Sequence, residues 1–260
     1  MSSFISTTVT KNILEITLNR PDKLNSFIEP MAHQLRDELG KAQKDEEIRC
    51  VLLTGEGKAF CAGQDLPEVV AKGDEYELGE TVRGSYNPII KAIRHLEKPV
   101  VCAVNGTAAG AGANLAFACD IIIASNEALF VQSFSKIGLI PDSGGTFLLP
   151  RLVGLQRANI MYLLDEKISP QKAVEMGLIY KVVDSAELTN EARRICQKLA
   201  IMPSKGFGLY KRAINQSFVN TLDEQLEVEA DLQTEAGKTH DYKEGVQSFL
   251  EKRKPKFKGK

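Results

Sequence analysis

VVCAVNGTAAGAGANLAFACD, residues 100–120, is the stretch that decides the fold we expect. Its first five residues are apolar on both faces of a strand, as a strand covered on both sides requires. Small residues dominate from Asn105 to Ala113, and a helical run follows over 114–118. Small side chains let a ligand approach the backbone closely, and the unpaired N–H groups at a helix start attract negative charge.

Three interpretations of this stretch stay open on the residues alone. A dinucleotide-binding fold would use Gly110 and Gly112 as its fingerprint, but Leu115 takes the third small position and the glycines follow the strand late. An oxyanion hole would use the backbone N–H of Ala111 to hold a carbonyl oxygen that becomes an enolate. Tight packing of a helix against a strand would need the same small residues.

The composition is that of an ordinary folded domain, with 43% hydrophobic and 26% charged residues among 260. A formal net charge of −1 argues against nucleic-acid binding by bulk electrostatics, although residues 252–260 are locally basic. No apolar run approaches a membrane span, and the first ten residues lack the regions of a signal peptide. We therefore expect a cytoplasmic protein.

The cysteines and histidines suggest neither a disulfide framework nor a metal site. The five cysteines are odd in number and form no C-x-x-C pair, and the three histidines have no partner motif. Most of these cysteines lie in apolar strand or turn contexts, so we expect small buried hydrophobic side chains. We predict no metal site.

Strand and helix patterns alternate in the first part of the chain. The predicted buried strands are 13–18, 50–54, 100–104, 121–124 and 180–183. Helical patterns between them favour crossover units and a largely parallel sheet, hence an α/β fold. Helical periodicity alone continues afterwards, so we divide the chain into a core at 1–184 and a helical oligomerisation region at 185–260. The polar segment 73–84 suits a mobile flap.

Two loops at strand ends could supply paired N–H donors to one carbonyl oxygen. They are residues 62–64 and 109–112, and such loops gather at one edge of an α/β sheet. The acids near the glycine-rich turns are Asp65, Asp120 and Asp142. Asp65 is expected to cap the helix that follows it. For Asp142 two roles stay open, capping of the next helix and catalysis. Asp120 is expected to bond loop amides.

Three segments resemble the marker segments of the crotonase, or enoyl-CoA hydratase/isomerase, superfamily. They are AFCAGQDL at 59–66, NGTAAGAG at 105–112 and GLIPDSGGTFLLPRLVG at 138–154. Residues 20–26 and the ending SFLEKRKPKF at 248–257 are similar to that family as well. The match runs from about Ile13 to the end of the chain with consistent order and spacing.

The resemblance implies a spiral of stacked ββα units, a C-terminal helical trimerisation region and acyl-CoA thioester substrates. It implies that the backbone N–H groups of Gln64 and Ala111 hold the thioester oxygen. Alanine replaces the usual glycine at 111 and keeps that N–H group. Since CoA is part of the substrate, no separate cofactor is expected.

The same resemblance suggests where the CoA part of the substrate binds. Lys23 is expected to contact it, together with the loop residues Ala62, Gly63, Asp65 and Leu66. Phe249 and Lys252 are expected to reach CoA from an adjoining subunit. Whether the assembly is a trimer or a dimer of trimers stays open.

The departures from the family pattern narrow the expected reaction. Classical hydratases use two glutamates, whose positions correspond here to Asn114 and Phe134. Neither can act as a carboxylate base, so hydration through the usual pair is disfavoured and both are expected to line the substrate site. Asp142 stands where several isomerases carry an acid. One carboxylate suffices to remove a proton and return it at another carbon.

Within the superfamily the sequence is most similar to the ring 1,2-epoxyphenylacetyl-CoA isomerases of phenylacetate degradation. FSKIGLIPDSGGTFLLPR at 134–151 and Tyr86-Asn87-Pro88 carry that similarity. It implies conversion of a ring epoxide to a seven-membered oxepin, with overlap into shifting enoyl-CoA double bonds. The alternatives are an enoyl-CoA hydratase using other groups and a non-catalytic scaffold that binds acyl-CoA or RNA through its basic end.

Overall fold

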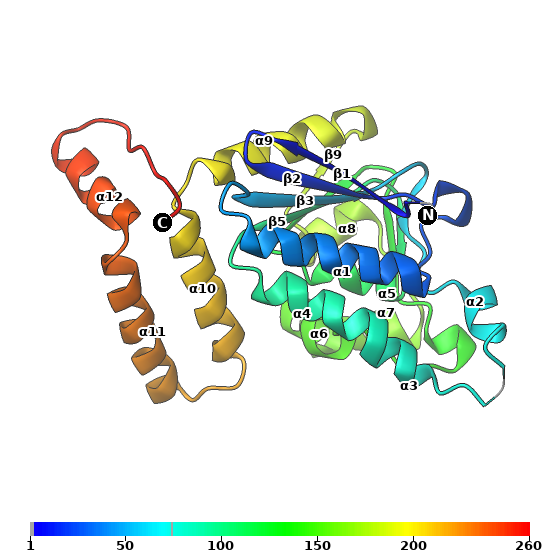
Figure 1. The fold of residues 1–260 in the computed structure, drawn as a ribbon. Helices are drawn as coiled ribbons and strands as arrows, with labels where there is room; N and C mark the ends of the chain where they lie inside the picture. The colour runs from blue at the N-terminus through cyan, green and yellow to red at the C-terminus, as the bar shows by residue number, and fades with distance from the viewer. Residues whose placement is uncertain (1–2, 74) are drawn as a thin grey trace.

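The computed structural model describes residues 3–73 and 75–260, and its helices surround two β-sheets (Figure 1). The strands of the large sheet, in spatial order, are β1 (Ile5–Thr10), β2 (Ile13–Leu18), β3 (Cys50–Gly55), β5 (Val100–Val104), β7 (Ile121–Ser125) and β9 (Lys181–Val183). The small sheet contains β4 (Ala59–Cys61), β6 (Thr107–Ala109) and β8 (Leu129–Val131). All pairs are parallel except β1 with β2.

Strand β1 was not predicted, and its sequence explains why. In ISTTVT only Ile5 is buried, so the strand shows no run of apolar residues. It pairs with β2 through a tight turn at Lys11 and Asn12, which both adopt positive φ, at 52° and 63°. Two such residues form the hairpin turn whose twist matches the flanking strands.

Each repeating unit of the fold gives one strand to each sheet. The chain passes from β3 to β4, from β5 to β6 and from β7 to β8. Successive units stack closely at Asn105 and Gly106: the Asn105 amide donates to the carbonyl oxygens of Gly57 and Ala59, at 2.9 and 3.2 Å. A Cβ on Gly106 would lie 2.0 Å from the Lys58 carbonyl oxygen. Because β6 follows β5 directly, the glycines do not form the strand-to-helix turn of a dinucleotide fold.

The first part of the chain contains helices between and after these strands. They are α1 (Glu29–Lys44), α2 (Leu66–Val70), α3 (Leu78–Thr81), α4 (Asn87–His95), α5 (Ala111–Phe117), α6 (Gly145–Val153), α7 (Leu155–Leu163) and α8 (Pro170–Glu175). Among them, α2, α3 and α5 contribute residues to the cavity described below. Helix α5 starts at Ala111, three residues before the predicted start. In the expected flap at 73–84, residue 74 lies outside the described residues, and the rest includes α3 and the first residues of a π-helical turn, Val82–Tyr86.

Two hydrophobic clusters lie on opposite faces of the large sheet. One contains Leu53 and Cys102 and packs against α1, α4 and α5. The other contains Leu52 and Val101 and packs against α9 (Leu188–Ala200). All five cysteines are buried and free, as expected for small hydrophobic side chains. The predicted boundary at 184 stays a prediction, and α9 beyond it shares a core with the sheet.

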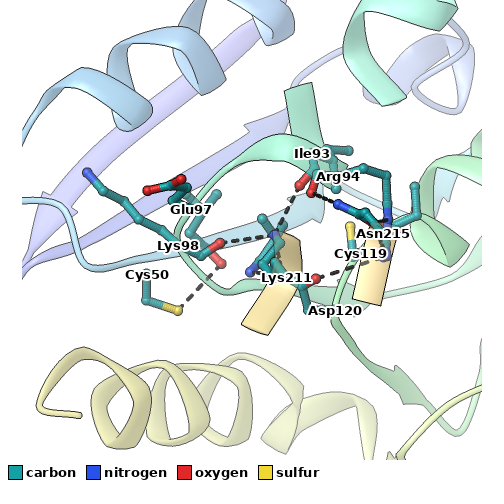
Figure 2. Close-up of polar contacts among 12 residues, drawn as sticks. Cys50, Ile93, Arg94, Glu97, Lys98, Cys119, Asp120, Lys211 and Asn215 are labelled. Carbon is teal, nitrogen blue, oxygen red and sulfur yellow. Dashed lines mark hydrogen bonds and ion pairs between the residues drawn. The ribbon is translucent and has the colours of Figure 1, made fainter. Parts of the chain in front are cut away.

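The last three helices extend away from the sheets (Figure 1). They are α10 (Ser204–Ser217), α11 (Leu222–Gly237) and α12 (His240–Leu250), within the region 185–260 where we predicted helices alone. Helix α11 has no buried residue. Helix α10 is attached to the core by Lys211, whose ammonium lies 2.7 Å from the Asp120 carboxylate and donates to the carbonyl oxygens of Ile93 and Lys98 (Figure 2). Within residues 3–73 and 75–260, none of the helices is both long and apolar enough to cross a membrane.

Candidate active site

A cavity of about 210 Å³ brings together most of the predicted site residues. Its described lining comes from the end of β4 and α2, from the segment around α3, from the start of α5 and from the turns before α6. The lining residues are Ala62, Gly63, Gln64, Leu66, Val69, Leu78, Thr81, Val82, Tyr86, Gly110, Ala111, Gln132, Ser133, Phe134, Ile137, Leu139 and Asp142. Most of these side chains are apolar, so a polar group inside the cavity interacts in a medium of low dielectric constant.

The two predicted N–H donors both lie in this lining. Ala111 is the first residue of α5, and among the described residues its N–H group has no acceptor. The same holds for the N–H of Gln64. The two segments touch, since a Cβ built on Gly63 would lie 3.5 Å from the Ala111 nitrogen. Two adjacent N–H groups at one end of an apolar cavity can stabilise an oxygen that gains negative charge.

The small residues of the central stretch serve both packing and access to the backbone. A Cβ on Gly112 would lie 2.3 Å from the Cys61 carbonyl oxygen, so Gly112 is required by contact between α5 and β4. Gly110 has φ 52° and ψ −125°, a backbone conformation that other residues rarely adopt. This conformation turns the chain into α5 with Ala111 in the cavity wall. The packing interpretation therefore holds at Gly112, next to the residue assigned to the oxyanion hole.

Asp142 is the one acidic side chain among the described residues that line the cavity. It does not cap α6, whose N-cap is Gly144 without a side-chain hydrogen bond. The Ser143 hydroxyl donates to its carboxylate at 2.9 Å. Burial raises the pKa of Asp142 above its ordinary value, and the Ser143 hydrogen bond opposes this in part. A carboxylate made more basic by an apolar cavity is suited to general acid–base catalysis.

Asn114 lies behind Asp142 and holds its backbone. It is fully buried, and its amide donates to the Asp142 carbonyl oxygen at 2.9 Å and accepts from Gln132 at 3.1 Å. A Cβ on Gly145 would lie 2.4 Å from the Asn114 amide nitrogen, so glycine is needed there. Asn114, predicted to contact substrate, is not among the described lining residues. Its contacts make it a support for the Asp142 turn.

Phe134 lines the cavity as predicted, and its ring lies beside Gly110, near the start of α5. Tyr86 lines it too and was given no role from the sequence. Tyr86-Asn87-Pro88 was noted for the family resemblance alone. The sequence could not predict where the Tyr86 hydroxyl lies, because its position depends on the π-helical turn that ends at Tyr86.

Asp65 lies outside the described cavity lining and has a structural role. Its carboxylate accepts from the Glu68 N–H group as the N-cap of α2 and pairs with Arg20 at 2.9 Å. Lys23 is exposed, and the next residue, Leu24, accepts a hydrogen bond from the Ala62 N–H group at 3.0 Å. Lys23 therefore lies next to the cavity loop, on the outside.

The C-terminal residues predicted to reach CoA are exposed in the single chain. Phe249 is 82% exposed on α12, and Lys252 is exposed just beyond it. Neither is among the described cavity lining. The basic end of the chain folds back on α12, where the buried Asp241 carboxylate accepts from the N–H groups of Lys258 and Gly259, each at 2.7 Å.

Comparison with known proteins identifies the family. The model of the enoyl-CoA hydratase/isomerase family matches residues 8–260. The chain belongs to the enoyl-CoA hydratase/isomerase family. It is 50% identical to 1,2-epoxyphenylacetyl-CoA isomerase of Escherichia coli K12 over 262 residues, covering all of both chains. It is 44% identical to a probable enoyl-CoA hydratase of Rhodobacter capsulatus, covering 97% of this chain and 96% of the relative.

Solved structures confirm the predicted crotonase fold. A putative enoyl-CoA hydratase/isomerase from Mycobacterium abscessus superposes with a TM-score of 0.93 at 36% identity, covering 98% of this chain and all of that one. The family resemblance drawn from residues 59–66, 105–112 and 138–154 is thereby confirmed, and so is the prediction that the chain is an enzyme of the isomerase type.

Proposed function

We propose that this enoyl-CoA hydratase/isomerase family member is an acyl-CoA isomerase that converts ring 1,2-epoxyphenylacetyl-CoA to oxepin-CoA. The observation that carries the proposal is one basic carboxylate, Asp142, in an apolar cavity that also holds the N–H groups of Gln64 and Ala111. The 50% identical relative from Escherichia coli, a 1,2-epoxyphenylacetyl-CoA isomerase, supports the choice of substrate. Moving an enoyl-CoA double bond from the β,γ to the α,β position uses the same groups.

The reaction begins at the carbon next to the thioester. With the thioester oxygen between the Gln64 and Ala111 N–H groups, the Asp142 carboxylate removes a proton from that carbon and an enolate forms. Each N–H donor of such a hole contributes roughly 3–4 kcal/mol to the transition state. The proton transfer contributes a further factor of roughly 10²–10⁴ in rate.

The second half of the reaction returns the proton elsewhere. In the aromatic epoxide the bond between the two epoxide carbons opens, which enlarges the ring to seven members. The carboxyl group of Asp142 then gives its proton to a ring carbon. In an enoyl-CoA it gives the proton to the γ carbon. Substrate and product are isomers in both cases, and no co-reactant is consumed.

The surroundings of Asp142 favour this reaction over addition of water. At the positions of the two hydratase glutamates the chain has Asn114, which is bonded to the Asp142 backbone, and Phe134, which makes that wall apolar. Hydration is the second candidate reaction, because the 44% identical relative from Rhodobacter capsulatus is named a probable enoyl-CoA hydratase. Hydration would need another group to activate the water.

Product mass separates the two reactions. The chain is incubated with ring 1,2-epoxyphenylacetyl-CoA and, separately, with a β,γ-enoyl-CoA, and products are followed by ultraviolet absorbance and mass. An isomerase gives a product whose mass equals that of the substrate. Gain of the mass of one water, labelled by solvent ¹⁸O, would identify a hydratase. Absence of turnover together with salt-sensitive RNA binding that is lost on removal of residues 252–260 would favour the non-catalytic scaffold.

We also propose that the chain works as a homo-oligomer, a trimer or a dimer of trimers, in which Phe249 and Lys252 contact CoA bound to a neighbouring chain. Lys23, Asp65 and Leu66 would contact CoA from the chain that holds the acyl group. The support is that helices α11 and α12 present exposed apolar side chains, among them Leu222, Leu226, Val246, Phe249 and Leu250. Sedimentation with and without acyl-CoA measures the assembly.

A further inference from the structure

Tyr86 makes two contacts with the segment that carries the Gln64 N–H donor. Its ring packs edge-on against Phe27, with ring centroids 5.9 Å apart and planes at 79°. Its hydroxyl donates to the side-chain oxygen of Gln64. Tyr86 is only 5% exposed, so both contacts lie away from bulk water.

Phe27, in turn, holds the backbone on both sides of Gln64. The Phe27 N–H group donates to the Gly63 carbonyl oxygen at 2.7 Å, and the Asp65 N–H group donates to the Phe27 carbonyl oxygen at 2.9 Å. This bridge leaves the N–H group of Gln64 unused by the described fold. The Tyr86 ring therefore supports residues 63–65 through Phe27, and the Tyr86 hydroxyl contacts Gln64 in the same segment directly.

The side-chain amide of Gln64 is oriented by its other partners. Its nitrogen donates to the Glu68 carboxylate at 3.1 Å and to the Phe27 carbonyl oxygen at 3.3 Å. Its oxygen must therefore face a donor, and among the described residues the Tyr86 hydroxyl fills that place. Burial raises the pKa of Tyr86, with the charge of Asp142 adding to the effect, so the hydroxyl keeps its proton.

The backbone before α4 places this hydroxyl. Residues Val82–Tyr86 form a π-helical turn, closed by the Asn87 N–H group donating to the Val82 carbonyl oxygen. Such turns insert one extra residue into a helix and occur often at functional sites. Here the turn connects Thr81 and Val82, which line the cavity, to Tyr86, whose hydroxyl reaches Gln64 in the same lining.

We infer that Tyr86 is a positioning residue, whose hydroxyl holds the Gln64 side chain and thereby fixes the backbone N–H group that receives the thioester oxygen. The inference rests on the proposed function, because it assigns Tyr86 to the same oxyanion hole. Loss of a whole donor reduces kcat by roughly 10²–10³-fold. A donor that is present but less well fixed is expected to reduce it by roughly tenfold.

The test uses Tyr86→Phe, which keeps the ring contact and removes the hydroxyl, and Gln64→Leu, which keeps the backbone N–H and removes the acceptor. Tyr180→Phe is the matched control, since Tyr180 is exposed and lies outside the cavity lining. The probe is acetoacetyl-CoA, a β-keto thioester whose enolate has its own ultraviolet absorbance. The bound enolate-to-keto ratio at fixed pH reports the oxyanion hole without requiring turnover.

We expect the wild-type chain and Tyr180→Phe to enrich the bound enolate. Tyr86→Phe and Gln64→Leu should each lower the enolate-to-keto ratio and kcat by roughly tenfold, with KM changed less than about threefold, and the double variant should lose no more than either single one. A wild-type ratio in either single variant, or additive losses, overturns the role of Tyr86 alone. If the wild-type chain fails to enrich the enolate, the oxyanion hole of the proposed function fails with it. Should Tyr86→Phe fail to fold, the ratio in Gln64→Leu decides.

Discussion

Replacing Ala111 by proline is expected to remove one of the two proposed oxyanion donors while keeping the fold. Ala111 is the first residue of α5, the helix position at which proline is best tolerated. Gly110 has ψ −125°, outside the α region that a following proline disfavours. Among the described residues the Ala111 N–H group donates to no acceptor, so the substitution breaks no hydrogen bond of the fold.

The expected loss follows from the number of donors. Two N–H groups, of Gln64 and Ala111, line the cavity, and removing one of them reduces kcat by roughly 10²–10³-fold, or about 2.7–4 kcal/mol. The proline ring also places a carbon where the proton was, which keeps water from replacing the donor. We expect KM to change little, because the interaction strengthens as the enolate forms.

The assay follows conversion of a β,γ-enoyl-CoA to its conjugated isomer by ultraviolet absorbance, and thermal unfolding checks the fold. Leu155→Pro is the control, since it places proline at the first position of α7, where Leu155 is exposed, follows a glycine of positive φ and lies outside the described cavity lining. The control should keep wild-type kcat. A kcat within about threefold of wild type for Ala111→Pro, with an intact fold, would refute the assignment of this N–H group to the oxyanion hole.

The other predictions concern the base, the packing of α5 and the attachment of α10. Asp142→Asn is expected to lower kcat by roughly 10²–10⁴-fold and to raise Tm near neutral pH. Burial raises the pKa of Asp142, so its contribution to stability falls as pH rises from the ordinary value of 3.8 through the raised pKa; a Tm gain at low pH only would contradict this sign. For the same reason kcat/KM in the wild-type chain should fall on acidification at a pH above 3.8, and an acid limb below that value would point to another base. Gly112→Ala should reduce the free energy of unfolding in urea by roughly 1–3 kcal/mol, since its Cβ would lie 2.3 Å from the Cys61 carbonyl oxygen; an unchanged midpoint would show that α5 can shift. Lys211→Met should reduce the free energy of unfolding by roughly 3 kcal/mol, the lower end for breaking a buried ion pair, because Arg94 remains 3.9 Å from the Asp120 carboxylate. Wild-type stability of this variant in the same urea titration would show that the ion pair does not hold α10.

The sequence by itself determined which segments form the buried strands and the helices, and which chemistry the loops between them favour. Buried strands such as β5 and helices such as α9 follow from apolar runs and helical periodicity, because those patterns depend on local burial. The segments at 59–66, 105–112 and 138–154 indicated the family by their resemblance to its marker segments, because such a resemblance depends on the order and spacing of residues alone.

The tertiary structure alone decided which of these residues meet. Asp65 and Asp142 both precede helices in the sequence, yet only Asp65 caps its helix, α2. Asp142 caps no helix and lies in the cavity lining, because Gly144 with its positive φ is the N-cap of α6. The partner of the Gln64 side chain lies 22 residues away, in a π-helical turn without a simple sequence signature. Contacts across such separations depend on how the ββα units stack, so periodicity along the chain cannot report them.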